Sequence, residues 1–300
     1  MTDRSAAYAS LQGLALGDAF GQTWFRHSDL DQLIAGRVTP PAPWPWTDDT
    51  AMALSLVRIL DEHGHVDQAA LAARFASAYQ ADPYRGYGPS MHGVLRDIFE
   101  GQEWREVTAR QFGGAGSWGN GAAMRVAPLG AWFAGDMDAV VEQAELSAVV
   151  THAHPEAASG AIAVAVAAAL AVRGVTGGSL INAVVARTPD GEVAARLRRI
   201  ADAPFHLHPQ MIASTVGCGT QVSAPDTVPF AVWCAARHLD DLTEALWATA
   251  SAGGDVDTTC AVVGGIVAGR TGLVGVPGEW WKARESLPEW VERLNGRVGA

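Results

Sequence analysis

Apolar residues recur every three or four positions through most of this chain, and this spacing is what most limits its possible folds. The pattern is clear over residues 71–79 and 140–149, whereas the alternating pattern of β-strands is scarce. Such spacing places apolar side chains on one face of a helix. The chain has 300 residues and 49% apolar content, which is enough to bury a sizeable core. We therefore expect an all-α protein.

Glycine and proline interrupt the helical pattern without forming a linker. The breaks fall at residues 40–45, 83–89, 113–121, 174–178 and 205–229. The stretch 206–227 is predicted to be the longest irregular segment, of a length that is often functional in compact domains. We expect a single compact domain over residues 1–300.

Charge and cysteine content exclude several classes of protein. The net charge is −11 without a basic block, so neither a strong nucleic-acid surface nor an anionic-membrane surface is expected. The longest small-apolar run, residues 161–172, predicts a core helix rather than a membrane span. Cys218, Cys234 and Cys260 are too few and too scattered for a disulfide framework, which predicts buried free thiols. Together these features indicate a soluble, cytoplasmic protein.

Two clusters of carboxylates stand directly before long apolar runs, at residues 46–50 and 253–259. Each is typical of the first turn of a helix, and ordinary helix capping explains either one alone. Capping needs only one side-chain oxygen, however, and these segments hold many more hard oxygen ligands: Asp48, Asp49, Asp255 and Asp257, with Thr47, Thr50, Thr258 and Thr259. Mg²⁺ and Ca²⁺ prefer such ligands, whereas Zn²⁺ prefers His or Cys, and neither a CxxC nor an HExxH spacing occurs in the sequence. Together the clusters predict a divalent-metal site.

Glycine-rich segments at residues 116–121 and 85–90 each surround an aromatic residue. Glycines allow backbone N–H groups to approach a phosphate, and an aromatic ring between them can stack on a base. The spacing fits neither a P-loop nor a dinucleotide-binding fingerprint. A ligand-free turn remains the alternative for both segments.

His152 and His154 form an HxH pattern before an alanine-rich helix. The pattern is weak evidence for zinc because no third ligand of the right type is nearby. A histidine that precedes a helix is more often a hydrogen-bonding group. For His152, contact with a ligand and a purely structural role are equally open.

Six segments in order resemble the ADP-ribosylglycohydrolase family, which includes the dinitrogenase-reductase-activating glycohydrolase. The resemblance extends from about residue 11 to residue 269, and its specificity comes from the order of segments that would each be weak alone. The segments are Gly17-Asp18-Ala19-Phe20-Gly21, Thr47-Asp48-Asp49-Thr50-Ala51-Met52, Gly86-Tyr87-Gly88, Gly116 to Arg125, Thr151-His152 with Gly160-Ala161, and Gly254-Asp255-Val256-Asp257-Thr258.

The resemblance implies an orthogonal helical bundle with two Mg²⁺ ions, or Mn²⁺, that bind ADP-ribose or an ADP-ribosylated substrate. It implies metal ligands at Thr47, Asp48, Asp49, Asp255, Asp257 and Thr258, with Asp257 bridging, and catalytic roles for Asp48, Asp49 and Asp257. It implies substrate contacts from Gly86, Gly88, Gly116, Ser117, Gly119, Asn120 and His152, with Trp118 stacking on adenine. Carboxylates and cations at this place would suit cleavage of a ribosyl bond, which builds positive charge on the sugar.

One position departs from the family pattern. Many members have a glutamate a few residues after the first Gly-Asp pair, and here Phe25 occupies that position. Phenylalanine neither binds metal nor moves a proton. Asp48 or Asp49 could act as the base through a metal-held water, Asp29 or His27 could substitute, or the protein could bind ADP-ribose without cleaving it. We favour the first.

The leading prediction is therefore a Mg²⁺-dependent hydrolase that releases ADP-ribose from a modified acceptor. A catalytically silent ADP-ribose-binding protein is the alternative, and a two-metal phosphohydrolase is a third, which leaves Trp118 without a role. The acceptor itself is not encoded in any motif. We expect it to dock near Trp24, Trp44, Trp46 and residues 206–227.

Overall fold

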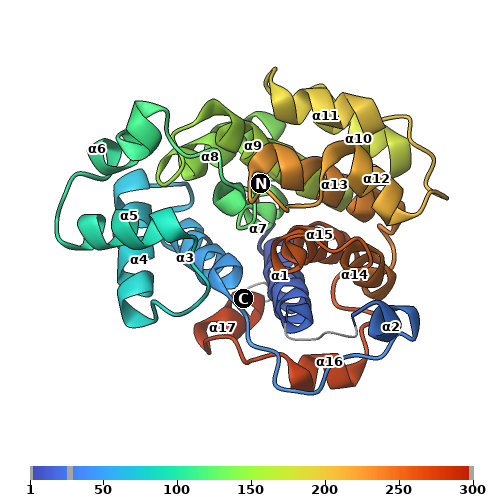
Figure 1. Ribbon diagram of the computed structural model, residues 1–300. Coiled ribbons are helices and arrows are strands. Elements are labelled where there is room, and N and C mark those ends of the chain that lie inside the picture. Colours follow the sequence, from blue (N-terminus) through green and yellow to red (C-terminus); the bar gives the residue numbers. More distant parts are fainter. Residues whose placement is uncertain (1–2, 26–29, 297–300) are drawn as a thin grey trace.

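The structure, a computed structural model, describes residues 3–25 and 30–296, and its regular elements are helices (Figure 1). Within these ranges there is no β-strand, only isolated bridges between Trp44 and Arg284 and between Gly119 and Ser223. The predicted all-α class is confirmed.

The elements follow one another in this order: α1 (Arg4–Trp24), α2 (Leu30–Ala35), α3 (Asp48–His63), α4 (Gln68–Ala81), α5 (Pro89–Phe99), α6 (Trp104–Ala109), the 3₁₀ helices η1 (Gln111–Gly114) and η2 (Asn120–Ala122), α7 (Ala127–Trp132), α8 (Met137–Val149), α9 (Pro155–Val172), α10 (Gly177–Val185), α11 (Glu192–Ile200), α12 (Pro209–Val216), α13 (Ala224–Arg237), α14 (Leu242–Ala250), α15 (Val256–Thr271), α16 (Gly278–Ala283) and α17 (Trp290–Gly296).

Helices α1 and α15 lie side by side at the centre of the molecule (Figure 1). Gly13, Gly17 and Gly21, four residues apart, form the contact face of α1. A Cβ atom on any of them would lie within 3.0 Å of α15 backbone, and on Gly17 it would meet the carbonyl oxygen of Cys260. The absence of a side chain therefore allows the two backbones to touch. This contact places the start of α15 against the later turns of α1.

An aromatic cluster packs around the C-terminal end of α1. Phe20 stacks on Trp280 of α16 at 4.9 Å between ring centroids, and it makes edge contacts with Trp24, Trp44 and Trp247. The Trp44 ring is only 1% exposed. These contacts fix the proline-rich segment that precedes α3 onto α1 and α16, because large buried rings contribute much apolar area.

The alanine-rich α9 is a core helix, as its sequence suggests. It extends over 18 residues, Pro155–Val172, and is long and apolar enough to cross a membrane by length and composition alone. However, 83% of it is buried inside the protein. Its small side chains allow close packing, for example where Gly130 of α7 meets the backbone of Ala165.

The prediction of an irregular segment over residues 206–227 is wrong. The structure has α12 there, and α13 begins at Ala224. Pro209 and Pro225 occupy first-turn positions, where the missing N–H costs nothing. Pro229 lies inside α13, and the Pro225 carbonyl that it cannot satisfy accepts a hydrogen bond from Arg196 at 3.2 Å. The hydrogen bond from Arg196, a residue of another helix, thus compensates for Pro229 and allows α13 to continue where the sequence predicted a break in the helix.

The three thiols are free, but only two of them are buried. Cys234 and Cys260 are fully covered inside α13 and α15, and burial raises their pKa. Cys218 is half-buried in the turn between α12 and α13, packed against Gly254. The expectation of three buried thiols is therefore wrong for Cys218, because it follows the end of a helix rather than lying within one.

The contact between α1 and α15 predicts that Gly17→Ala is strongly destabilising. The added methyl group would overlap the Cys260 carbonyl, and overpacking of this kind typically costs about 1–3 kcal/mol. Gly93, inside α5, serves as the control, because a methyl group added there would meet no atom within 4 Å. We expect Gly93→Ala to stabilise the protein by roughly 0.5–1 kcal/mol through helix propensity. Chemical denaturation of both variants checks this, and equal stabilities would contradict it.

Candidate metal centre

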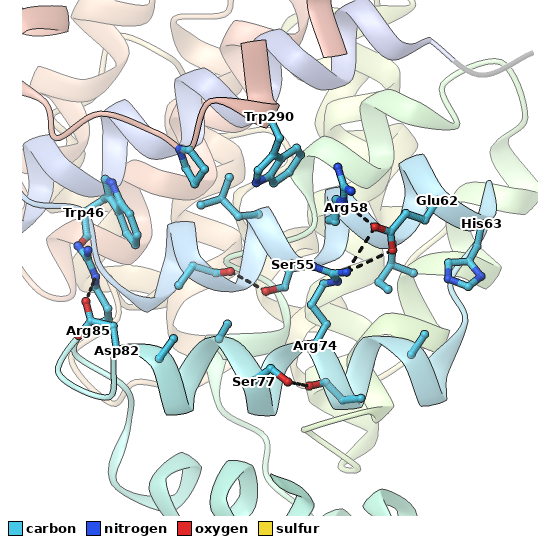
Figure 2. A pocket seen from close by; sticks show the side chains of 18 residues that line it. Trp46, Ser55, Arg58, Glu62, His63, Arg74, Ser77, Asp82, Arg85 and Trp290 are labelled. Carbon is cyan, nitrogen blue, oxygen red and sulfur yellow. Dashed lines mark hydrogen bonds and ion pairs between the residues drawn. The ribbon is translucent and has the colours of Figure 1, made fainter. Parts of the chain in front are cut away.

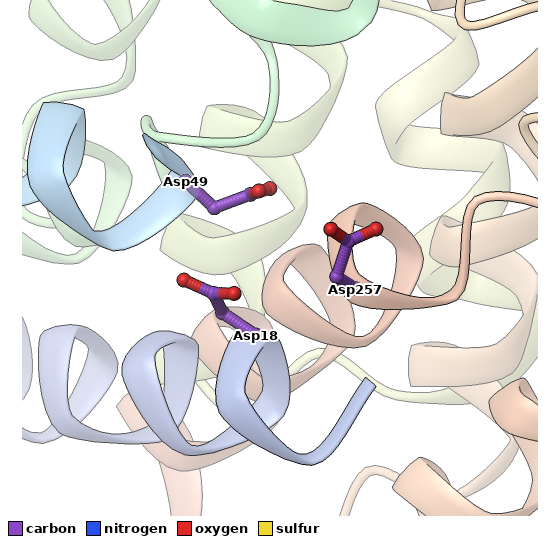
Figure 3. A group of neighbouring side chains, drawn as sticks. All are labelled: Asp18, Asp49 and Asp257. Atoms are coloured by element: carbon purple, nitrogen blue, oxygen red, sulfur yellow. The ribbon is translucent and has the colours of Figure 1, made fainter. Parts of the chain in front are cut away.

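Three helices bring aspartates together at one place in the fold. Asp18 lies in α1, Asp49 in the first turn of α3 and Asp257 in the first turn of α15, and their carboxylates point toward one another (Figure 3). One carboxylate oxygen from each lies within 4.8 Å of those of the other two. Asp48 and Asp255 lie at the same two helix starts. The structure therefore unites the two acidic clusters predicted from the sequence.

Asp18 holds the start of α3 in place. Its Oδ2 accepts hydrogen bonds from the backbone N–H groups of Thr47 and Thr50, at 2.8 and 3.1 Å, and from the Thr50 hydroxyl at 2.5 Å. Its Oδ1 lies 2.9 Å from the Thr47 hydroxyl. A helix N-terminus has unpaired N–H donors, and here another helix satisfies them. Burial raises the pKa of Asp18 to about 6, and the hydrogen bonds oppose this rise.

Asp18 is not among the site residues predicted from the sequence, although it lies within the Gly17-Asp18 motif. A single charged residue within the apolar run of residues 14–20 was the available signal. Because its Oδ2 already accepts three hydrogen bonds from the start of α3, Asp18 is well suited to position that helix.

One carboxylate oxygen of Asp49 is buried without a hydrogen-bond partner. Its Oδ2 accepts a hydrogen bond from the Thr47 hydroxyl at 2.8 Å, whereas its buried Oδ1 has no hydrogen-bond partner. A buried, unpaired carboxylate oxygen is costly, and a cation would remove the cost. Burial, followed by the charges of Asp18 and Asp257, holds the pKa of Asp49 well above its usual range.

Asp48 is more accessible than Asp49. Its backbone N–H donates to the carbonyl oxygen of Arg85 at 2.7 Å, and its Oδ1 lies near Gly86, 3.5 Å from where a Cβ would be. Burial and the neighbouring Asp18 raise the pKa of Asp48 to about 8. The predicted glycine segment at residue 86 therefore borders the acidic cluster directly.

At the start of α15, Asp255 occupies the N-cap position but makes no capping hydrogen bond. It instead accepts a hydrogen bond from Asn120 at 2.6 Å, and Asn120 also contacts Thr227 at 3.0 Å. Asp257 Oδ1 accepts from the N–H of Thr258 at 2.9 Å, and burial and the adjacent Asp255 raise the pKa of Asp257 well above its usual range. Asn120, predicted to contact substrate, is thus buried behind a predicted metal ligand.

The glycine-rich loop at residues 116–121 rests on His152. A Cβ on Gly119 or Gly121 would lie 3.2 or 3.0 Å from His152 Nε2. The other ring nitrogen lies 2.7 Å from the Thr151 hydroxyl. Burial, with the nearby Arg125, lowers the pKa of His152 to about 3, so the ring is neutral. Its position supports a hydrogen-bonding role beneath the loop, and neither His152 nor His154 belongs to the cluster of Asp18, Asp49 and Asp257.

In the first half of this loop, Gly116 and Ser117 are buried and the Trp118 ring is exposed to solvent. Gly116 has a φ of 75° and lies against the backbone of His154, a place that tolerates no side chain. Ser117 is buried, and its hydroxyl accepts a hydrogen bond from the N–H of Gly119 at 3.2 Å. Trp118 is 52% exposed and contacts the edge of His154. An exposed ring of this size is available for stacking.

A cavity of about 270 Å³ adjoins the cluster at Thr47 and Gly86, with Trp46, Tyr84 and Gln22 in its walls. Among the tryptophans predicted to border the acceptor, Trp46 thus lines a cavity next to the acidic cluster. Trp24 and Trp44, in contrast, are buried in the aromatic cluster at 2% and 1% exposure, so the prediction that they border the acceptor is wrong. Their aromatic neighbours, unknown from the sequence, bury them.

A larger groove of about 620 Å³ runs between α3 and α4 on the other side of Trp46 (Figure 2). Its lining is mainly apolar, with Arg58, Glu62 and Arg74 near one end. Apart from Trp46, it contains none of the side chains predicted for the site or its acceptor.

Taken together, the acidic cluster can hold divalent cations. The partnerless oxygen of Asp49, the half-buried Asp255 and Asp257, and the accessible Asp48 provide hard oxygen ligands. Like charges this close repel one another strongly unless protons or cations offset them. The chemistry of these donors therefore favours Mg²⁺, Mn²⁺ or Ca²⁺.

Comparisons with known proteins show which family this chain is similar to. A family model described as ADP-ribosylglycohydrolase matches residues 1–300. ADP-ribosylhydrolase ARH3 of Homo sapiens is 30% identical, covering 93% of this chain and 89% of the human protein, and an uncharacterized protein of Archaeoglobus fulgidus is 31% identical, covering 94% and 93%. A solved structure titled ADP-ribosylglycohydrolase-related protein complex has a TM-score of 0.67 and 26% identity, covering 98% of this chain and 95% of that one.

The raised pKa values predict how stability depends on pH without divalent cations. Carboxyls whose pKa is higher in the folded state than in the unfolded chain stabilise the fold at low pH, and this stabilisation is lost as pH rises through the folded pKa. With Asp18 at about 6 and Asp48 at about 8, we expect the melting temperature in EDTA to fall between pH 5 and pH 8. Calorimetry should also show that Mg²⁺ raises it more at pH 8. In Asp49→Asn the fall should be smaller, and a melting temperature that rises with pH would contradict this account.

Proposed function

This chain belongs to the ADP-ribosylglycohydrolase family, and we propose that it releases ADP-ribose from a modified acceptor in a reaction that requires divalent cations. The observation that carries this proposal is the buried Asp49 oxygen without a partner, in the middle of converging carboxylates. In a cluster with a structural role alone, such a buried carboxylate oxygen would have a hydrogen-bond partner, because leaving it unpaired destabilises the fold. Family membership supports the hydrolase activity, and the cluster supports its dependence on metal.

We assign the metal ligands to the two helix starts. Thr47, Asp48 and Asp49 would hold the ions from α3, and Asp255, Asp257 and Thr258 from α15, with Asp18 and Asn120 keeping these groups in place. When bound, two Mg²⁺ ions, or Mn²⁺, would supply positive charge that offsets the carboxylates and orients the ribose hydroxyls. The positive ends of the α3 and α15 dipoles also favour ionised carboxylates there.

The chain's own groups then account for binding and bond cleavage. The N–H groups of Gly116, Gly119 and Asn120 donate to partners within the protein. Other backbone N–H groups of the two glycine segments would bind the pyrophosphate, and the exposed Trp118 ring would stack on the adenine. As the bond to the acceptor breaks, positive charge develops on the ribose, which the nearby carboxylates stabilise. Asp48 is the accessible carboxylate of its pair, so we assign to it the proton of the attacking water.

One observation favours a second candidate function, binding of ADP-ribose without cleavage. Phe25, which stands where many family members have glutamate, directly follows α1 and is 55% exposed. Because a phenylalanine side chain has no ionisable group, Phe25 supplies neither an acid nor a base to the site. The possible substitutes His27 and Asp29 lie outside the described residues.

The proposed activity predicts release of ADP-ribose from arginine- or serine-modified peptides in Mg²⁺ and its loss in EDTA. Asp257→Asn and Asp48→Asn should each lower the rate by about a hundredfold, because each removes charge that acts on the developing cation. Asp202→Asn, an exposed aspartate, is the control. Chromatography separates ADP-ribose from AMP and phosphate, and the latter products would indicate the phosphohydrolase. Unchanged rates in both site variants would contradict the proposal.

Turnover of the unaltered chain and the effect of Phe25→Glu together distinguish the two candidate functions. If the protein is a slow hydrolase, an added carboxylate at this exposed position should speed hydrolysis by roughly tenfold or more. If it is a binding protein, calorimetry should show tight ADP-ribose binding in Mg²⁺ while turnover of the unaltered chain is absent. Phe25→Gln controls for the loss of the ring without adding a base.

A further inference from the structure

Arg85 joins the metal-binding start of α3 to the segment that follows α16. We propose that Arg85 and Glu285 are positioning residues that fix Asp48 in the geometry needed for metal binding. This inference rests on the proposed metal centre, although neither side chain belongs to the acidic cluster itself.

The link to Asp48 is made by the backbone of Arg85. Its carbonyl oxygen accepts the hydrogen bond from the Asp48 N–H at 2.7 Å. This N–H is one of the donors that the first turn of a helix leaves unpaired. This backbone contact therefore restrains Asp48 from outside α3.

The guanidinium group of Arg85 lies beside the Trp46 ring and Asp82 (Figure 2), and its contacts restrain the residue whose carbonyl binds Asp48. It stacks 3.5 Å over the Trp46 ring and donates to the Trp46 carbonyl at 3.0 Å. Two further hydrogen bonds, at 2.7 and 2.8 Å, run side by side to the two oxygens of Glu285, and Nε donates to Asp82 at 2.7 Å. A bidentate pair of this kind fixes orientation as well as distance. Residues 46–48 and 85 are therefore fastened together.

Glu285 is itself anchored to the same segment. Its N–H donates to the Trp44 carbonyl at 2.9 Å, and the Trp44 N–H donates to Ala283 at 2.7 Å. The buried Trp44 ring packs on Phe20 and Trp280. The Arg85 side chain is only 19% exposed, and that of Glu285 is 34% exposed. The pair thus connects the aromatic cluster to the start of α3, which carries Asp48.

Loss of the ion pair between Arg85 and Glu285 should loosen residues 46–48, at the start of α3, without unfolding the protein. The core contact between α1 and α15 and the aromatic cluster involve neither side chain. Asp18 would still hold Thr47 and Thr50. The expected consequence is weaker metal binding, because groups that orient a ligand typically contribute 10- to 100-fold to metal affinity.

The test measures Mn²⁺ binding by calorimetry, with Mg²⁺ as competitor, in Glu285→Gln, Arg85→Lys and the double variant. Each single variant should bind Mn²⁺ about tenfold more weakly, and the double variant no more weakly than either single one. Glu289→Gln, an exposed glutamate in the same segment, is the matched control. Melting temperatures in EDTA should change by no more than about 3 °C, which separates positioning from general destabilisation.

The outcomes distinguish this inference from the proposed function. If the unaltered chain binds Mn²⁺ and Glu285→Gln binds it equally well, the positioning role is overturned while the metal centre stands. If the unaltered chain binds no divalent cation, both fall. Weaker binding that appears only together with a large loss of thermal stability would assign the pair to the fold alone and overturn the inference.

Discussion

The direct backbone contact between α1 and α15 is the constraint on which the rest of the site depends. Three glycines four residues apart remove the side chains that would separate the two helices. The start of α15 consequently lies beside Asp18, and Asp18 in turn holds the N-terminal N–H groups of α3. Two helix starts far apart in the sequence thereby converge on one residue of a third helix, which makes a multi-carboxylate centre possible.

This convergence is electrostatically unfavourable by itself. Burial and mutual repulsion raise the pKa of Asp48, Asp49 and Asp257, and one Asp49 oxygen has no partner. The structure moderates the repulsion through the positive ends of two helix dipoles and through the hydrogen bonds that Asp18 and Asp255 accept. What remains is negative charge suited to divalent cations. In the proposed function, bound cations would offset this charge and give an acidic protein a local positive field for a pyrophosphate.

Several polar residues contact the residues of the candidate site and hold them in place. Asn120 binds Asp255, neutral His152 lies beneath the glycine loop, and Arg85 fastens the start of α3 to Glu285. Each fixes a backbone or a carboxylate that faces the centre, and metal and phosphate sites depend on such supporting contacts. Phe25, by contrast, is exposed, and a cavity lies beside Thr47.

The sequence by itself determined the helical class, the two acidic helix starts and the family, because apolar spacing, capping residues and ordered motifs are local properties of the chain. The tertiary structure alone decided which partner each polar group finds. Asp18 became a cap for another helix, Asn120 turned toward Asp255, and Arg196 allowed a proline inside α13. Hydrogen bonds between distant segments depend on how helices pack, and packing here follows from backbone contacts that local patterns do not reveal.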